Sequence, residues 1–253
     1  MRLNRFMARA GVASRRKSDN LIRRGAVRVN GEVVAAPGRP VGGEDRVGVD
    51  GIPVRLPEDS QYLLLNKAAG TLVTRRDRSG RPTVFEGIEE VRAATVAVGR
   101  LDRDTTGVLL LTDDGELAHR LMHPRFEVDK RYRALVEGVP SAAALRQLRD
   151  GVLLEDGMTA PARVRIVSPP SAERPFCELD LCVHEGRKHQ IKRMCAAVGH
   201  RVRRLHREAF AGLTAAALQP GQCRRLREAE TRHLRSLVGL PAREELQPWP
   251  PGD

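Results

Sequence analysis

An aspartate set among arginines is the residue of this sequence whose surroundings most suggest chemistry. Asp102 stands in GRLDRDTTGVLLLTDDG, residues 99–115, between Arg100 and Arg103 and just before an aliphatic run. A carboxylate can act as a nucleophile when a nearby cation keeps it ionised in a cleft. Asp102 can equally be a turn residue paired with a neighbouring arginine, and spacing alone leaves both interpretations open.

A second notable segment is strongly basic. Residues 186–207 contain eight arginines or lysines and no acidic residue. Apolar residues recur there with helical spacing, at Ile191, Met194, Cys195 and Val198, and Gly199 ends the pattern. We expect the basic residues to point away from the core, with Arg187 at the start of the helix and Lys188, Lys192 and Arg193 along it. The start of a helix also favours anions. This segment suits a large folded anion such as RNA.

Two histidine pairs invite a metal-site interpretation that their spacing does not support. His119 and His123 are four residues apart, whereas HEGRKH places His184 and His189 five apart across Gly186. The glycine-rich nucleotide-binding motifs and the local signatures of serine or cysteine nucleophiles are absent from the sequence. We expect no metal and no cofactor.

The composition is basic in a particular way. The chain has 253 residues and a net charge of +12, and only five of its 44 basic residues are lysines. Arginine forms bidentate hydrogen bonds with phosphate and stacks on bases, which favours a nucleic-acid partner. A GC-rich genome produces the same excess of arginine over lysine. Arginines interrupt the N-terminal residues, so they form no apolar core of a signal peptide. The longest aliphatic run is far too short to span a bilayer. The four cysteines have no C-x-x-C spacing, which argues against a zinc site. We expect a cytoplasmic protein with free thiols and no membrane contact.

Residues 1–55 are predicted to form a small unit of two helices and two hairpins. A helical stripe runs from Leu3 to Ala10, Ser14 can cap a second helix, and Asn-Gly and Asp-Gly pairs mark the two hairpins. Six cations crowd the second helix and the strand after it: Arg15, Arg16, Lys17, Arg23, Arg24 and Arg28. A solvated helix face is the alternative. Because Asp19 is the only counter-charge there, we favour phosphate binding.

The rest of the chain has the pattern of an α+β domain. After a polar linker at 56–61, residues 62–240 combine strand-like and helical segments. The strand-like segments are 62–67, 94–99, 107–112, 130–138, 162–167 and 177–186, and the helical ones 116–122 and 141–151. Hairpin-like spacing mixed with helices predicts a mixed, largely antiparallel sheet flanked by helices. The proline-rich residues 241–253 are predicted to be a disordered tail.

Longer segments resemble a known family. GRLDRDTTGVLLLTDDGELAHRLMHP followed by KRYRALVEG resembles the central motif of the ribosomal-RNA pseudouridine synthases of the small-subunit and large-subunit uridine type. EGRKHQIKRM and RLHREAFAGLTAAALQPGQCRRL resemble later segments of that family. RLNRFMARAGVASRRKSDNLIRRGAVRVNGEVV resembles the RNA-binding domain of the ribosomal-protein S-four type. These segments span roughly residues 2–226 in the family's order.

The resemblance implies a reaction and roles for individual residues. Uridine would be detached from its ribose, turned and rejoined through carbon five, without cofactor or metal, after the base is flipped out of its stack. Asp102 would be the catalytic nucleophile, Tyr132 would lie against the base, Arg187 would be the basic partner of the aspartate, and Leu205 would line the pocket. We expect a monomer acting on ribosomal RNA, with the large subunit favoured over the small. The alternative is a non-catalytic, RNA-binding ribosome-assembly factor on the same fold.

Overall fold

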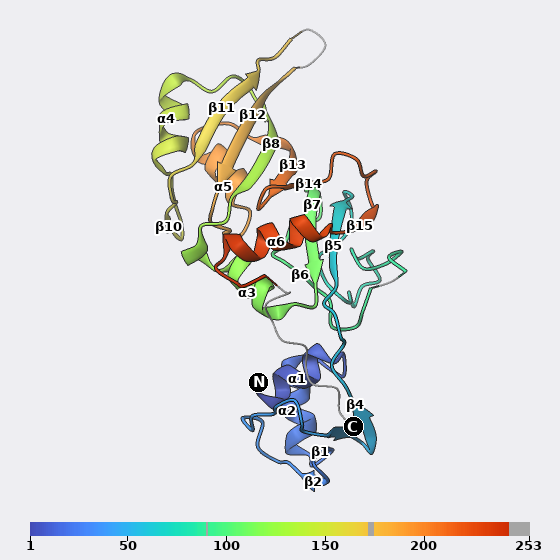
Figure 1. The fold of residues 1–253 in the computed structure, drawn as a ribbon. Coiled ribbons are helices and arrows are strands. Elements are labelled where there is room, and N and C mark those ends of the chain that lie inside the picture. The colour runs from blue at the N-terminus through green and yellow to red at the C-terminus, as the bar shows by residue number, and fades with distance from the viewer. Residues whose placement is uncertain (90, 172–174, 243–253) are drawn as a thin grey trace.

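The first part of the chain packs two helices on a small sheet (Figure 1). The computed structural model describes residues 1–89, 91–171 and 175–242, so nearly all of the predicted tail lies outside the described residues. Helices α1 (Leu3–Arg9) and α2 (Arg15–Arg23) precede strands β1 (Val27–Val29), β2 (Glu32–Val33), β3 (Val47–Val49) and β4 (Ile52–Val54). The Ser14 hydroxyl caps α2, and Asn30 and Asp50 adopt left-handed turn conformations. Both helices and both hairpins were predicted from the sequence.

A nine-stranded sheet organises the rest of the chain, in the order β11-β12-β8-β13-β7-β5-β15, with β14 beside β13 and β6 beside β7. Its strands are β5 (Tyr62–Lys67), β6 (Val96–Ala97), β7 (Thr106–Thr112), β8 (Lys130–Glu137), β11 (Arg163–Ser168), β12 (Phe176–Val183), β13 (Val202–Phe210), β14 (Leu213–Thr214) and β15 (Cys223–Arg225). Strands β13 and β7 pair in parallel and the other neighbours pair antiparallel. The predicted α+β class with a mixed, largely antiparallel sheet is confirmed.

The helices cover opposite faces in the two halves of this sheet. They are α3 (Gly115–Met122), α4 (Ala142–Asp150), α5 (Gln190–Ala197) and α6 (Glu228–Leu237), with a short 3-10 turn at Pro124–Phe126 and a small hairpin of β9 (Leu153–Leu154) and β10 (Gly157–Met158). Helices α3 and α6 pack on Leu64 and Leu110 of β5 and β7. Helices α4 and α5 pack on Ala134 and Leu179 of β8 and β12. Because side chains alternate along a strand, these two contact surfaces belong to opposite faces of the sheet.

The two halves of the sheet meet at a narrow parallel contact. Strands β7 and β13 pair at two positions only, Thr106 with His206 and Gly107 with Arg207. Gly107 has φ +105°, and a Cβ built there would lie 2.2 Å from the carbonyl oxygen of Arg207. Beyond this contact, Nε of the buried Arg207 donates to the carbonyl of Val108 at 2.7 Å. The Arg207 side chain thus donates to a carbonyl of β7 in place of a backbone N–H group, at the point where the two strands separate.

A buried lysine ties the loop before β7 to the end of β5. Lys67 is fully buried, and its Nζ donates to the carbonyls of Ala68, Arg103 and Thr105 at 3.0, 3.2 and 2.9 Å. Burial lowers the pKa of this ammonium to about 8, while Asp104 and Asp102 act in the opposite direction. The ammonium therefore fixes the path of the loop through its backbone.

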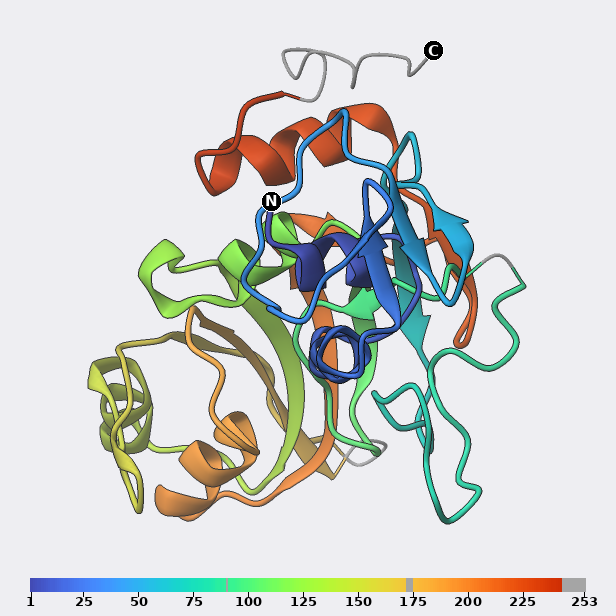
Figure 2. The ribbon, with the colours of Figure 1, turned by 90° about the horizontal axis from the view of Figure 1, so that it is seen from below.

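The first unit contacts the large domain below α3. Arg5 Nη2 lies 2.8 Å from Glu116 Oε2 at the first turn of α3, and the pair is largely exposed to solvent. Viewed from below, the first unit overlaps the half of the sheet that contains β5 and β7, while α4 and α5 lie to one side (Figure 2). Within the described residues, no helix is both long enough and apolar enough to cross a membrane.

Gly107→Ala is expected to destabilise the fold by about 3 kcal/mol, because the new Cβ overlaps the backbone of β13 and the left-handed conformation disfavours a side chain. The measurement is the free energy of unfolding from urea titration. Gly115→Ala is the matched control, since Gly115 opens α3 and a Cβ there meets no atom within 4 Å. Equal stabilities of the two variants would contradict the close approach at Gly107.

Lys67→Met is expected to remove a rise in stability between pH 8 and 10. The folded-state pKa of about 8 lies below the ordinary 10.5, so the unfolded chain binds more protons in this interval and stability increases with pH. Between pH 7.5 and 9.5, the free energy of unfolding of the wild type should rise by about 1–2 kcal/mol relative to that of the variant, as measured by urea titration. A constant difference between the two proteins across this range would show that Lys67 is not a desolvated ammonium.

Candidate active site

Asp102 faces two basic side chains at the start of α5. It lies in the loop between β6 and β7, with 29% of its side chain exposed. Its Oδ1 is 3.4 Å from Nε2 of His189, and its Oδ2 is 3.5 Å from Nζ of Lys192. His189 is the N-cap of α5 and Lys192 belongs to its first turn, so one helix end contacts both oxygens of the carboxylate.

Lys192 also binds a second aspartate of the same loop. Its Nζ donates to both carboxylate oxygens of Asp104, at 2.6 and 2.8 Å. This hydrogen bond is the main cause of the lowered pKa of Asp104. Lys192 therefore lies between two aspartates and fastens α5 to the loop that carries Asp102.

Arg187 does not make the expected pair with Asp102. Its guanidinium binds the Glu185 carboxylate at 3.2 Å and the carbonyl of Gly157 at 2.8 Å, with further bonds to the carbonyls of Asp156 and Met158. These contacts hold the strand β10 segment against the start of α5. Among the described residues, the basic side chains within 4 Å of Asp102 are those of His189 and Lys192, and Arg187 makes its contacts elsewhere.

Tyr132 lies on the same face of the sheet as the Asp102 loop. Residues directly opposite each other in neighbouring strands share a face. Tyr132 is opposite Arg207, Arg207 opposite Gly107, and Gly107 opposite Lys67, which in turn binds the loop through its ammonium. Tyr132 is half-buried at the edge of the apolar cluster under α5.

Leu205 belongs to this cluster as well. It lies opposite Ala134 in β8 and is 6% exposed. The structure thus places Leu205 in the apolar layer shared with Tyr132, two residues along β13 from Arg207.

The remaining predicted RNA-binding cations fall into two groups. In α5, Arg193 pairs with Asp156 at 2.5 Å, and Lys188, two residues before the helix, is exposed. In the first unit all six predicted cations are exposed, and within the described residues none of them makes an ion pair within 4 Å. Those of the first unit are thus available to an external anion, namely Arg15, Arg16, Lys17, Arg23, Arg24 and Arg28.

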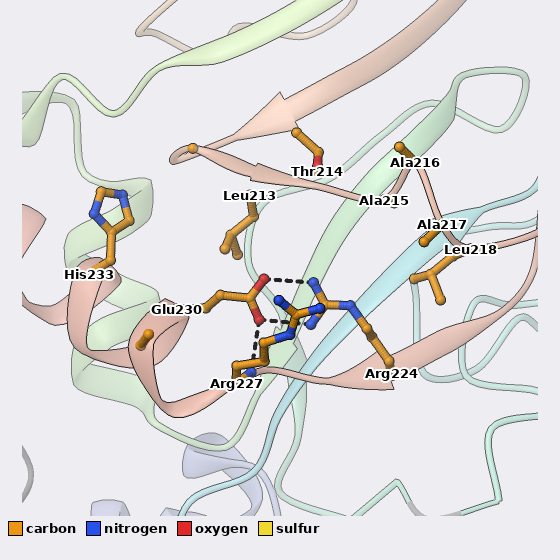
Figure 3. Close-up of a pocket in the computed structure, with 12 residues that line it drawn as sticks. Leu213, Thr214, Ala215, Ala216, Ala217, Leu218, Arg224, Arg227, Glu230 and His233 are labelled. Atoms are coloured by element: carbon orange, nitrogen blue, oxygen red, sulfur yellow. Dashed lines mark hydrogen bonds and ion pairs between the residues drawn. The ribbon is translucent and has the colours of Figure 1, made fainter.

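Two hollows of the surface are lined by other residues. One of about 460 Å³ lies between residues 212–218 and the start of α6, where Glu230 binds Arg224 at 2.6 Å (Figure 3). Another of about 390 Å³ is lined by Arg131 and Arg165, which both pair with Asp180 on the face opposite Tyr132. No group of three metal-ligating side chains gathers in the part of the chain that the structure describes.

Three residues of the site were not predicted from the sequence as parts of it: Lys67, Asp104 and His189. Lys67 had a local signal, because it is a charged residue closing the apolar strand YLLLNK. Asp104 and His189 had no such signal, because their contacts join segments more than 80 residues apart.

Comparison with known families gives two matches. Residues 61–197 match the model of the RNA pseudouridylate synthase family, and residues 1–47 match that of the S4 domain. The first match contains Asp102, Tyr132 and the whole of α5.

Relatives match over nearly the whole chain. The chain is 43% identical over 237 residues to the ribosomal large subunit pseudouridine synthase B of Bacillus subtilis, covering 94% of this chain and 96% of the relative. It is 44% identical over 242 residues to an RNA pseudouridine synthase of Aquifex aeolicus, covering 95% and 96%. A crystal structure of a pseudouridylate synthase superposes with a TM-score of 0.66 at 32% identity, covering 92% of this chain and 99% of the other. The chain therefore belongs to the RNA pseudouridylate synthase family and is an intramolecular isomerase with an N-terminal S4 domain.

Proposed function

We propose that this isomerase converts a uridine of large-subunit ribosomal RNA to pseudouridine, with Asp102 as the nucleophile. The observation that carries the assignment of Asp102 is its position: a partly exposed carboxylate held between His189 and Lys192, on the face of the sheet that also bears Tyr132. The Bacillus subtilis relative is named for the large ribosomal subunit, which supports that subunit as the source of the RNA.

The reaction exchanges one bond at the ribose for another. The bond from C1′ to N1 of uracil breaks, the base turns, and a bond from C1′ to C5 forms, while C5 loses a proton and N1 gains one. An ionised Asp102 provides the attacking oxygen, and the bond that this oxygen forms to the substrate breaks again before the product leaves, which restores the carboxylate. Nζ of Lys192 lies 3.5 Å from Oδ2 of this carboxylate, and Nε2 of His189 lies 3.4 Å from Oδ1.

Tyr132 and Leu205 suit the binding of the extruded base. Flipping a base from its stack removes stacking contacts, and an aromatic ring replaces part of them, by about 1–3 kcal/mol per base. Tyr132 is half-buried and next to the apolar layer that contains Leu205, so its ring has a supported side and an open side. We assign Tyr132 to stacking and Leu205 to the support beneath it.

The two parts of the chain have different roles. Residues 1–55 supply cations that are free of internal ion pairs among the described residues, and residues 62–240 supply the site. Phosphate contacts position an enzyme on RNA without reading its bases. We assign affinity and placement to the first part and chemistry to the second.

Asp102→Asn is expected to lower the single-turnover rate at saturating enzyme by about 1,000-fold or more, because an amide is a poor nucleophile. The readout is pseudouridine mapping in ribosomal RNA and in vitro conversion of that RNA. Asp104→Asn is the contrasting variant: it loosens the bond between Lys192 and the loop but keeps the carboxylate of Asp102, and it should retain measurable turnover. Full turnover by Asp102→Asn would remove this residue from the chemistry.

A double variant, Arg16→Gln with Arg24→Gln, should weaken RNA binding while the rate at saturating enzyme stays unchanged. Each phosphate of a single strand that the variant no longer neutralises should reduce the salt slope of log K by about 0.7. The measurement is binding titrated at several salt concentrations. Arg146→Gln with Arg232→Gln removes the same charge from exposed faces of α4 and α6 and should leave the slope nearly unchanged. Equal slopes for both double variants would show that the first unit is not the RNA anchor.

A further inference from the structure

Residues 70–88, which we call the arginine segment, cover part of the sheet face that bears the candidate active site. Val84 of this segment packs with Leu65 of β5 in one apolar cluster. Leu65 and Lys67 are two residues apart in the same strand, so their side chains share a face. The pairings across β7, β13 and β8 place Tyr132 on this face as well. The arginine segment and α5 therefore cover different halves of one face.

The arginine segment begins beside the loop that carries Asp102. The backbone N–H of Gly70 donates to the carbonyl of Arg103 at 2.8 Å, and Nε of Arg103 donates to the carbonyl of Gly70 at 3.2 Å. Seen from below, the segment, in teal, extends on one side of the strands and α5, in orange, lies on the other (Figure 2). The loop with Asp102 is thus bound by α5 through Lys192 and by the arginine segment through Gly70.

Two of the four arginines in this segment hold its own backbone in place. The guanidinium of Arg75 lies over the ring of Phe85, 4.2 Å from the ring centroid, and its Nε donates to a backbone carbonyl just before β6 at 3.1 Å. Arg81 donates two hydrogen bonds to the carboxylate of Asp77, at 2.7 and 3.1 Å. This carboxylate also accepts the backbone N–H groups of Ser79 and Arg81. The bonds from Arg81 hold the pKa of Asp77 well below its ordinary value, so the turn is built around an ionised carboxylate.

The other two arginines, Arg76 and Arg78, flank Asp77 and are exposed. Within the residues that the structure describes, neither guanidinium makes an ion pair or a hydrogen bond. The other carboxylate of this part of the segment, that of Glu86, accepts bonds from Thr83. Both acids nearby are therefore occupied, and the two guanidinium groups carry uncompensated positive charge on a turn that is already formed. A preformed turn loses less conformational freedom on binding than a flexible one.

We propose that Arg76 and Arg78 bind phosphates of the RNA strand next to the target uridine, on the side of the site away from α5. The inference deepens the proposed function and rests on it for the position of this uridine at Asp102. Guanidinium groups form bidentate, charge-assisted bonds with phosphate, and each phosphate that they neutralise releases counterions. The strand is then held at a second place besides the first unit, and two separate attachments fix its direction across the site.

The test is a salt titration of RNA binding by the double variant Arg76→Gln with Arg78→Gln. The probe is a transcript of the large-subunit RNA region that contains the uridine found by pseudouridine mapping. Loss of two phosphate contacts should reduce the salt slope of log K by about 1.4 and weaken binding about 20-fold at 0.1 M salt, with the two affinities converging toward 1 M. In single-turnover conversion, the enzyme concentration that gives half the maximal rate should rise by the same factor.

Two matched variants make the outcome decisive. Arg76→Lys with Arg78→Lys keeps both charges and should keep the salt slope of the wild type. Arg146→Gln with Arg232→Gln removes the same charge from α4 and α6 and should also keep it. An unchanged slope in the glutamine variant of the arginine segment, or an equal loss in its lysine variant, would overturn the phosphate contact. Failure of the wild type to convert the transcript would contradict the proposed function, whereas conversion with an unchanged slope in the glutamine variant would contradict this inference alone.

Discussion

Two lysine ammonium groups hold the loop before β7, one through its backbone and the other through a side chain, and the geometry of the site depends on them. Lys67 binds the backbone carbonyls of Arg103 and Thr105 from within the sheet, and Lys192 binds the carboxylate of Asp104 from α5. Asp102 directly precedes these anchored residues. Its position is thus set by its neighbours, and its carboxylate stays partly exposed to meet a substrate.

The arrangement of the apolar clusters explains how α5 comes to face that loop. Ile191, Met194 and Cys195 are buried against β8 and β12, and burial in this cluster raises the pKa of the Cys195 thiol to about 12. Residues three and four apart share a helix face. Once Ile191 and Cys195 are buried, Lys192 projects toward the edge of the cluster, where the loop passes. Apolar burial on one side of an eight-residue helix thereby orients the cation on the other.

The sequence predicts the local elements well and the contacts between them poorly. Periodic apolar residues and Asn-Gly or Asp-Gly turns identify the helices and hairpins of the first unit, and aliphatic runs identify β5 and β7. Strand β13 was missed because VRRLHREAF is rich in charge, yet it crosses the middle of the sheet, with its charged residues partly on an open face. Helix α6 was missed for a similar reason. Asp102 stood out by its arginine neighbours, but the basic side chains that reach it are those of His189 and Lys192, because the docking of α5, and not sequence spacing, decides which residues lie beside it.

The narrow contact between β7 and β13 is where the two halves of the sheet meet. Polar contacts cross it, among them the buried bond from Arg207 to Val108, the bond of 2.8 Å between Thr106 Oγ1 and His206 Nδ1, and the pair of Lys192 with Asp104, whose side chain is 73% exposed. Salt screens exposed charges and leaves buried hydrogen bonds largely unaffected. Rising ionic strength is therefore expected to weaken the pair of Lys192 with Asp104 and to leave the bond from Arg207 to Val108 in place. Asp102 and Tyr132 lie on different sides of this contact, one in the loop before β7 and the other in β8.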